Sequence, residues 1–134
     1  MRSLLMTFSL LLSLNAFAEY KSSDEIVKEF KTFTKADGTK GNEHLADLVA
    51  KVDDAVKYAT VEKASSEALT QIVRVSAITL KHDDSAAVAD VLIPLYKKDL
   101  KAFKKALKTL PKSDADSLLK SIQDAIKEEQ NGNG

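Results

Sequence analysis

Apolar residues recur with the period of an α-helix through most of the chain after residue 18. The first predicted helix follows Ser22, which with Glu25 has the spacing of a capping box, and it ends before Asp37. Its apolar positions are Ile26, Val27, Phe30 and Phe33. The glycine-containing stretch 36–42 then predicts a loop. Asn42 is placed to cap the helix that follows this loop.

The second predicted helix has the clearest apolar stripe in the chain. Its members are Leu45, Leu48, Val49, Val52, Val56 and Ala59. The third segment runs from about residue 61 or 66 to 81, and its apolar residues surround most of the helix circumference. Several of them are β-branched, so a strand is the alternative, but the length of the segment favours a central buried helix.

Three further helices are predicted after residue 82. Asp83, Asp84 or Ser85 can cap the fourth, and Pro94 lies close enough to its end to kink or stop it. A fifth follows from about residue 97 and is closed by Pro111, and Ser113 opens the sixth. The fold class is therefore all-α, a small antiparallel bundle of five to six short helices or a stack of helical hairpins.

The first 18 residues have the pattern of a cleavable signal peptide. Arg2 precedes an apolar run from Leu4 to Leu14, and Ala16 and Ala18 form an A-x-A cleavage site. We expect export, to a bacterial periplasm or the extracellular space, of one helical domain over residues 19–134. Its tail should fray from about residue 129. The chain has no cysteine, so disulfides and lipid modification of cysteine are excluded.

Catalytic residue types are scarce, and each candidate has a structural alternative. Ser65 or Ser66 could pair with a histidine, but serine before a helix is favoured for capping. The sequence His82-Asp83-Asp84 could supply metal ligands, but it also matches the charges that two adjoining helix ends prefer.

His44 has Glu43 beside it and Asp47 three residues on, without a visible third metal ligand. The stretch around Asp37 lacks the alternating acidic residues of a calcium loop. We expect no catalytic centre, no metal and no cofactor, and hence no enzyme.

Charge is unevenly distributed along the chain. Residues 97–112 hold seven lysines against one acidic residue, whereas residues 19–96 hold 10 basic and 14 acidic residues. Five lysines are predicted to line the outer face of the fifth helix, namely Lys97, Lys101, Lys104, Lys105 and Lys108. This face could bind an acidic protein or an anionic membrane surface, or it could pair with acidic residues of the same domain. Nucleic acid is disfavoured, since Arg74 is the only arginine after residue 18.

These patterns predict an exported, non-catalytic helical protein that binds another protein through a helical face. The five lysines are the expected contact residues, and the protein partner is not identified by the sequence. The alternative is a periplasmic carrier or sensor of a lipid or other amphiphile. In that case the apolar third helix would line an interior cavity and the lysine-rich helix would meet an anionic headgroup.

Overall fold

The computed structural model describes residues 20–132, and every regular element in that range is helical. The α-helices are α2 (Ser23–Phe30), α3 (Asn42–Val61), α4 (Ser66–His82), α5 (Ala87–Lys98), α6 (Leu100–Leu107) and α7 (Lys112–Gly132), and a 3₁₀-helix, η1, spans Lys35–Thr39. The all-α prediction is therefore confirmed for the described residues. The signal peptide predicted at residues 1–18 lies outside them.

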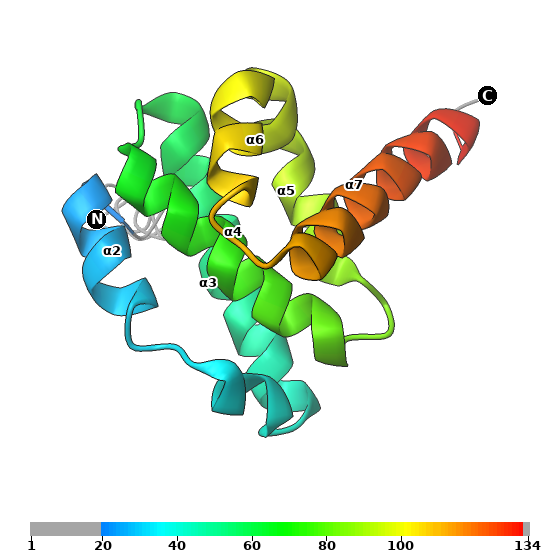
Figure 1. Ribbon diagram of the computed structural model, residues 1–134, viewed down its shortest axis with the longest axis horizontal. Coiled ribbons are helices and arrows are strands. Elements are labelled where there is room, and N and C mark those ends of the chain that lie inside the picture. Colours follow the sequence, from blue (N-terminus) through cyan, green and yellow to red (C-terminus); the bar gives the residue numbers. More distant parts are fainter. Residues whose placement is uncertain (1–19, 133–134) are drawn as a thin grey trace, which may run out of the picture.

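Helix α4 is the centre of the fold (Figure 1). It packs against α2, α3, α5, α6, α7 and η1, and nine of its 17 residues are buried. Two of the buried residues are polar, and the hydroxyls of Ser76 and Thr79 donate to carbonyl oxygens within the helix. Their burial therefore leaves no hydroxyl unsatisfied. The predicted buried helix is confirmed, and the strand alternative is wrong.

The chain between α2 and α3 differs from the sequence prediction. Helix α2 ends at Phe30, earlier than expected, and Phe33 lies half-buried in the turn that follows. The predicted loop contains η1, because Thr34 and Asp37 form a capping box across its first turn. The N-cap of α3 is Gly41, whose φ of 115° favours glycine, rather than Asn42.

Pro94 lies inside α5 and does not end that helix. The break comes at Asp99, which is both the C-cap of α5 and the N-cap of α6. Its side chain accepts a hydrogen bond of 3.0 Å from the backbone N–H of Ala102 and so satisfies a free donor at the start of α6. Pro94 is exposed and has no N–H to donate to the carbonyl oxygen of Asp90, so α5 continues past it with one backbone hydrogen bond fewer.

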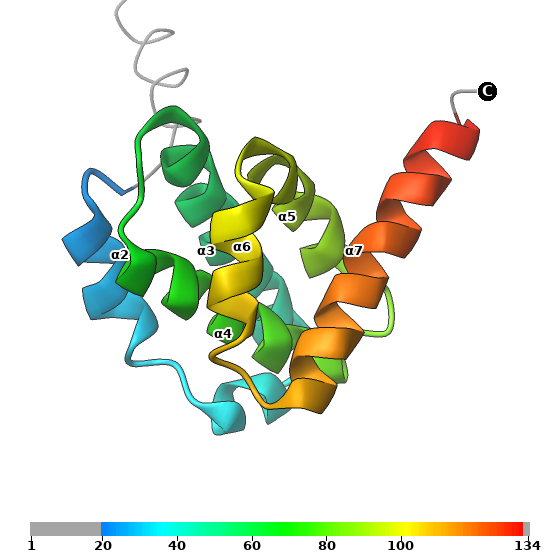
Figure 2. The same ribbon diagram turned by 45° about the horizontal axis from the view of Figure 1, so that its top comes forward.

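Helix α7 packs against α5 and α4, with contacts to the core from Ala115 as far as Ile126, and its C-terminal end projects away from the other helices (Figure 2). Of its residues, Leu118 and Ile122 are buried. The tail that we expected to fray from about residue 129 remains helical as far as Gly132.

Candidate functional site

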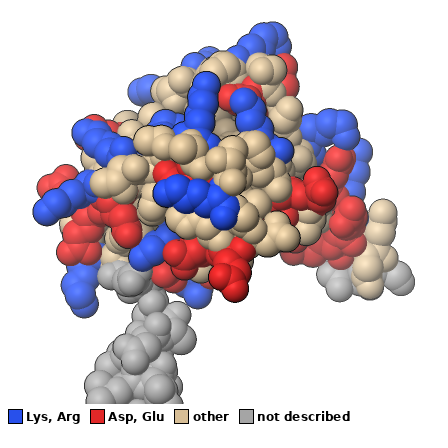
Figure 3. Space-filling model, turned by 90° about the horizontal axis from the view of Figure 1, so that it is seen from below, with Lys and Arg blue, Asp and Glu red and all other residues tan. Residues whose placement is uncertain are grey.

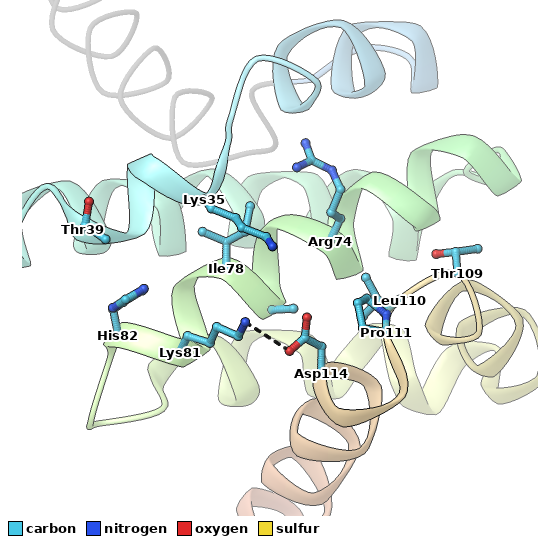
Figure 4. A pocket seen from close by; sticks show the side chains of 11 residues that line it. Lys35, Thr39, Arg74, Ile78, Lys81, His82, Thr109, Leu110, Pro111 and Asp114 are labelled. Atoms are coloured by element: carbon cyan, nitrogen blue, oxygen red, sulfur yellow. Dashed lines mark ion pairs between the residues drawn. The ribbon is translucent and has the colours of Figure 1, made fainter.

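A cavity of about 370 Å³ lies where η1, the C-terminal half of α4 and the turn between α6 and α7 meet (Figure 4). Its lining comes from segments that are far apart in sequence, at residues 35–39, 74–82, 109–111 and 114. The cavity therefore exists only once η1 and the start of α7 have packed against α4.

The floor of this cavity is apolar. Ala77 and Ile78 contribute to it from α4, and Leu110 and Pro111 contribute from the turn. Ala77 and Ile78 are buried, but they do not belong to the main hydrophobic cluster of the helices. The apolar residues of α4 thus serve two regions, since most fill the core and these two face the cavity.

The rim of the cavity is mainly basic. It holds Lys35, Arg74 and Lys81, together with His82, and Asp114 is its only acidic member. Asp114 lies 3.4 Å from the amine of Lys81, and a dashed line marks this ion pair in Figure 4. Lys35 extends from η1 beside Ile78 and forms no ion pair within the described residues. With His82 neutral, three cations and one carboxylate give the rim a net charge of +2.

Arg74 is held in a fixed position by hydrogen bonds to the end of α2. Its Nη2 and Nη1 atoms donate to the carbonyl oxygens of Phe30 and Phe33, at 2.7 and 2.9 Å, and Nε donates to Gln71. Burial lowers the pKa of Arg74, although a guanidinium stays charged in proteins. Arg74 therefore adds a permanent positive charge to the wall and is a second donor to the carbonyl oxygen of Phe30, which also accepts from the backbone N–H of Phe33.

Gly38 lets η1 approach α4 closely beside the cavity. A Cβ atom at this position would lie 2.7 Å from Cδ2 of His82 and 3.2 Å from Cγ2 of Ile78. A larger residue would push η1 and the C-terminal end of α4 apart. The position of Lys35 above the cavity floor therefore depends on this glycine.

Asp37 anchors η1 through a cluster of polar contacts. Its Oδ2 accepts a 2.6 Å hydrogen bond from the backbone N–H of Thr34, and its Oδ1 lies 2.9 Å from Nε2 of His44 and 3.1 Å from the amine of Lys40. The Thr34 bond lowers the pKa of Asp37 to about 2, the contacts with Lys40 and His44 act in the same direction, and burial opposes them. The sequence placed His44 with Asp47, but the structure pairs it with Asp37.

The other polar candidates act as helix caps. Asp83 accepts hydrogen bonds from the backbone N–H groups of Ser85 and Ala87 at the start of α5. Ser65 is the N-cap of α4, and its hydroxyl accepts from the backbone N–H of Ala68. The capping interpretation is thus confirmed for Ser65. The prediction that Asp83, Asp84 or Ser85 caps the fourth helix is wrong, because the N-cap of α5 is Ala86, which forms no side-chain cap hydrogen bond, and Asp83 is the C-cap of α4. Within residues 20–132, no group of three or more His, Asp or Glu side chains is placed to hold a metal ion.

The structure brings four of the five predicted lysines together. Lys101, Lys104, Lys105 and Lys108 are exposed on α6 or at its C-cap, spaced i, i+3, i+4 and i+7, on the side away from the buried Phe103. We call these four residues the lysine stripe. None of them forms an ion pair with another described residue, and none lines the cavity.

Lys97 lies apart from the stripe. It belongs to α5 and pairs with Glu129 of α7 at 3.6 Å. The sequence left open whether these five lysines pair with acidic residues of the same domain. Among the described residues, Lys97 is the one of the five that forms such a pair.

Among the described residues, no helix combines the length and the hydropathy needed to cross a lipid bilayer. No protein-family model, curated protein or solved structure matches this chain. The cavity and the charges of the surface are the features of this structure that indicate a function.

Proposed function

We propose that this chain is an exported, non-catalytic binding protein for a small anionic amphiphile, a molecule with one apolar part and one acidic group. The observation that carries the proposal is the apolar floor of the cavity beneath a rim of net positive charge. The apolar part would contact Ala77, Ile78 and Leu110. The acidic group would meet Lys35, whose amine has no anionic partner among the described residues.

The size of the cavity supports a small ligand. Its volume of about 370 Å³ lies at the lower end of the range of small-molecule sites, about 300 to 1,000 Å³. Apolar contact in such a site supplies most of the binding free energy, and a few charged groups set the orientation of the ligand. A medium-chain carboxylate has both of these features.

Export belongs to the same proposal and rests on the sequence of residues 1–18. Cleavage after Ala18 would leave a mature domain of residues 19–134 in a periplasm or outside the cell. We further propose that its helices form a closed antiparallel bundle, in which the cavity lies at the edge of the core.

Decanoate is the probe that tests this function. We expect titration of the ¹⁵N-labelled mature chain with decanoate to shift the amide resonances of residues 74–82 and 109–111. Lys35→Gln removes the unpaired cation of the rim and should weaken decanoate binding about 10-fold, equivalent to about 1.4 kcal/mol. Decanol has no charge, so its weaker binding should be unaffected by this change.

The matched control is Lys28→Gln, which removes an exposed lysine of α2 that does not line the cavity. It should bind decanoate as the unchanged protein does. Ala77→Leu places a larger side chain in the cavity floor and should reduce the affinity for both probes. Shifts confined to other segments, or equal affinities of the Lys35→Gln and Ala77→Leu variants and the unchanged protein, would refute the proposal.

Binding of another protein through a helical face remains a prediction. The lysine stripe is the exposed helical face to which this prediction applies. The lysine stripe and the cavity share no residue, so binding at one of them can be tested independently of binding at the other.

A further inference from the structure

Two exposed apolar side chains accompany the lysines near α6. Val61, at the end of α3, is 78% exposed, and Leu100, at the start of α6, is 40% exposed. They are the only large hydrophobic residues of residues 20–132 with such exposure. Single exposed apolar side chains are common on protein surfaces, so what distinguishes these two is that they lie among lysines rather than that they are exposed.

Lys98 brings the two helix ends that carry these side chains together. Its amine donates to the carbonyl oxygens of Ala59 and Glu62, at 2.7 and 3.2 Å, and so joins the end of α5 to the end of α3. Figures 1 and 2 place the end of α3 and the α5–α6 junction at the same upper end of the molecule. Val61 and Leu100 therefore project from one end of the fold.

This end of the molecule is strongly basic. Residues 61–63 and 97–108, which we call the basic pole, hold seven lysines and two acidic residues, a net charge of +5. Glu129 of α7 pairs with Lys97 and lowers the local net charge to +4. One of the two acids, Asp99, is engaged in capping α6. The opposite side of the molecule differs, since in Figure 3 basic and acidic side chains alternate over the face seen from below.

We infer that the basic pole docks the protein on the surface of an anionic lipid bilayer, with Val61 and Leu100 entering the interface. Lysine stems can lie along the lipid surface while their amines contact anionic headgroups. Each lysine close to such a surface strengthens binding about fivefold. The stripe keeps four like charges three or four residues apart on one helix, and an anionic surface would offset their repulsion.

A lipid surface fits this pole better than an acidic protein does. Val61 and Leu100 lie at helix ends and project outward, so a folded partner would need a pocket shaped for each of them. A bilayer accepts isolated projecting side chains without such complementarity. The pole also lacks arginine, the residue that binds carboxylates in a bidentate manner.

The experiment is co-sedimentation of the mature chain with vesicles. We expect binding to phosphatidylcholine vesicles that contain phosphatidylglycerol, little binding to phosphatidylcholine alone, and weakening by salt. The variant Lys104→Gln/Lys105→Gln/Lys108→Gln should lose on the order of 100-fold in apparent affinity. Leu100→Asn should weaken the binding that persists in high salt, because that binding depends on apolar insertion.

A matched control separates docking by the pole from attraction by net charge. Lys21→Gln/Lys28→Gln/Lys127→Gln removes three exposed lysines outside the pole and changes the net charge equally. It should bind the anionic vesicles nearly as well as the unchanged protein.

Three results would overturn the inference. The first is a failure of the unchanged protein to bind anionic vesicles in low salt, and the second is an equal loss in the two triple variants. The third is tighter binding to polyglutamate than to the vesicles, which would assign the stripe to an acidic protein.

Circular dichroism of each variant establishes that a loss of binding is not a loss of fold. Decanoate binding should be the same in the pole variants, so this inference and the proposed function can fail independently.

Discussion

Helices α4 and α7 are both long, but they contribute to the fold in opposite ways. Nine of the 17 residues of α4 are buried, compared with two of the 21 residues of α7. The reason lies in the sequence, since apolar residues surround α4, whereas α7 has one narrow apolar stripe on a polar helix. The width of the apolar surface, rather than the length of a helix, indicates how much of the core depends on it.

The comparison also applies within α7. Its first half supplies Leu118 and Ile122 to the core and Asp114 to the cavity rim. Its second half carries partly buried residues such as Ile126, and then exposed ones to the end of the helix. Stability should therefore decrease along α7, and substitutions at Ile72 and Ile126 test this contrast with α4 directly.

The largest effect is expected in the centre of α4. Ile72 is fully buried, and Ile72→Ala should lower the free energy of unfolding by about 3 kcal/mol, because apolar contacts are lost and a cavity remains. The same change at Ile126 should cost about 1 kcal/mol or less, since that side chain is already partly in water. Urea unfolding measures both values. Equal losses at the two positions would show that α7 is as central as α4.

An intermediate effect is expected at η1, which packs against α4. Asp37→Asn should lower the free energy of unfolding at pH 7 by about 1 to 2 kcal/mol, because the charged contacts of the carboxylate are lost. The pKa of Asp37 is about 2 in the folded chain and 3.8 as its ordinary value. The carboxylate therefore stabilises the fold above pH 4, and this contribution disappears as the pH falls towards 2.

Unfolding of both proteins between pH 6 and pH 2 measures this effect. The difference in unfolding free energy between the unchanged protein and Asp37→Asn should shrink as the pH falls through the window from about 4 to 2. A difference that stays constant over that range would contradict the role of the Asp37 charge in anchoring η1.

The smallest effect is expected at the exposed surface of α7. Lys112 and Asp116 form an ion pair of 3.0 Å, and both side chains are mostly in water. Lys112→Gln should change the free energy of unfolding by less than about 0.5 kcal/mol, because water and salt screen such pairs. Thermal unfolding in low and high salt measures it. A loss as large as that of Ile72→Ala would reverse the proposed order of α4 and α7.

The sequence was most informative where one period dominates a segment. The apolar stripe of α3 and the apolar residues around α4 predicted both helices. The apolar residues recur with the helical period because the helix must bury them in the core. The periodic pattern did not predict the structure between α2 and α3, because side-chain hydrogen bonds rather than apolar burial determine the local structure there. The spacing of Thr34 and Asp37 was the available signal for η1, since it is the spacing of a capping box.

The cavity was less predictable than the helices. The alternative in which the apolar third helix lines the cavity of a lipid or amphiphile carrier stays a prediction, although Ala77 and Ile78 of α4 do line a cavity. The cationic rim comes from Lys35, Arg74 and Lys81 rather than from the fifth predicted helix, because long-range packing alone brings these residues together. The sequence did not predict the contact between His44 and Asp37, because the helical spacing of three residues favoured Asp47 as the partner of His44.

Arg74 gives the cavity a thermodynamic connection to the N-terminal part of the domain. The same guanidinium holds the carbonyl oxygens of Phe30 and Phe33 and forms part of the cavity wall, although no residue of α2 touches the cavity. If α2 detaches, the wall loses the contacts that orient this charge. A ligand of the proposed kind that contacts Arg74 would therefore link occupancy of the cavity to docking of α2, and such a linkage is reciprocal, so that each would favour the other by the same free energy.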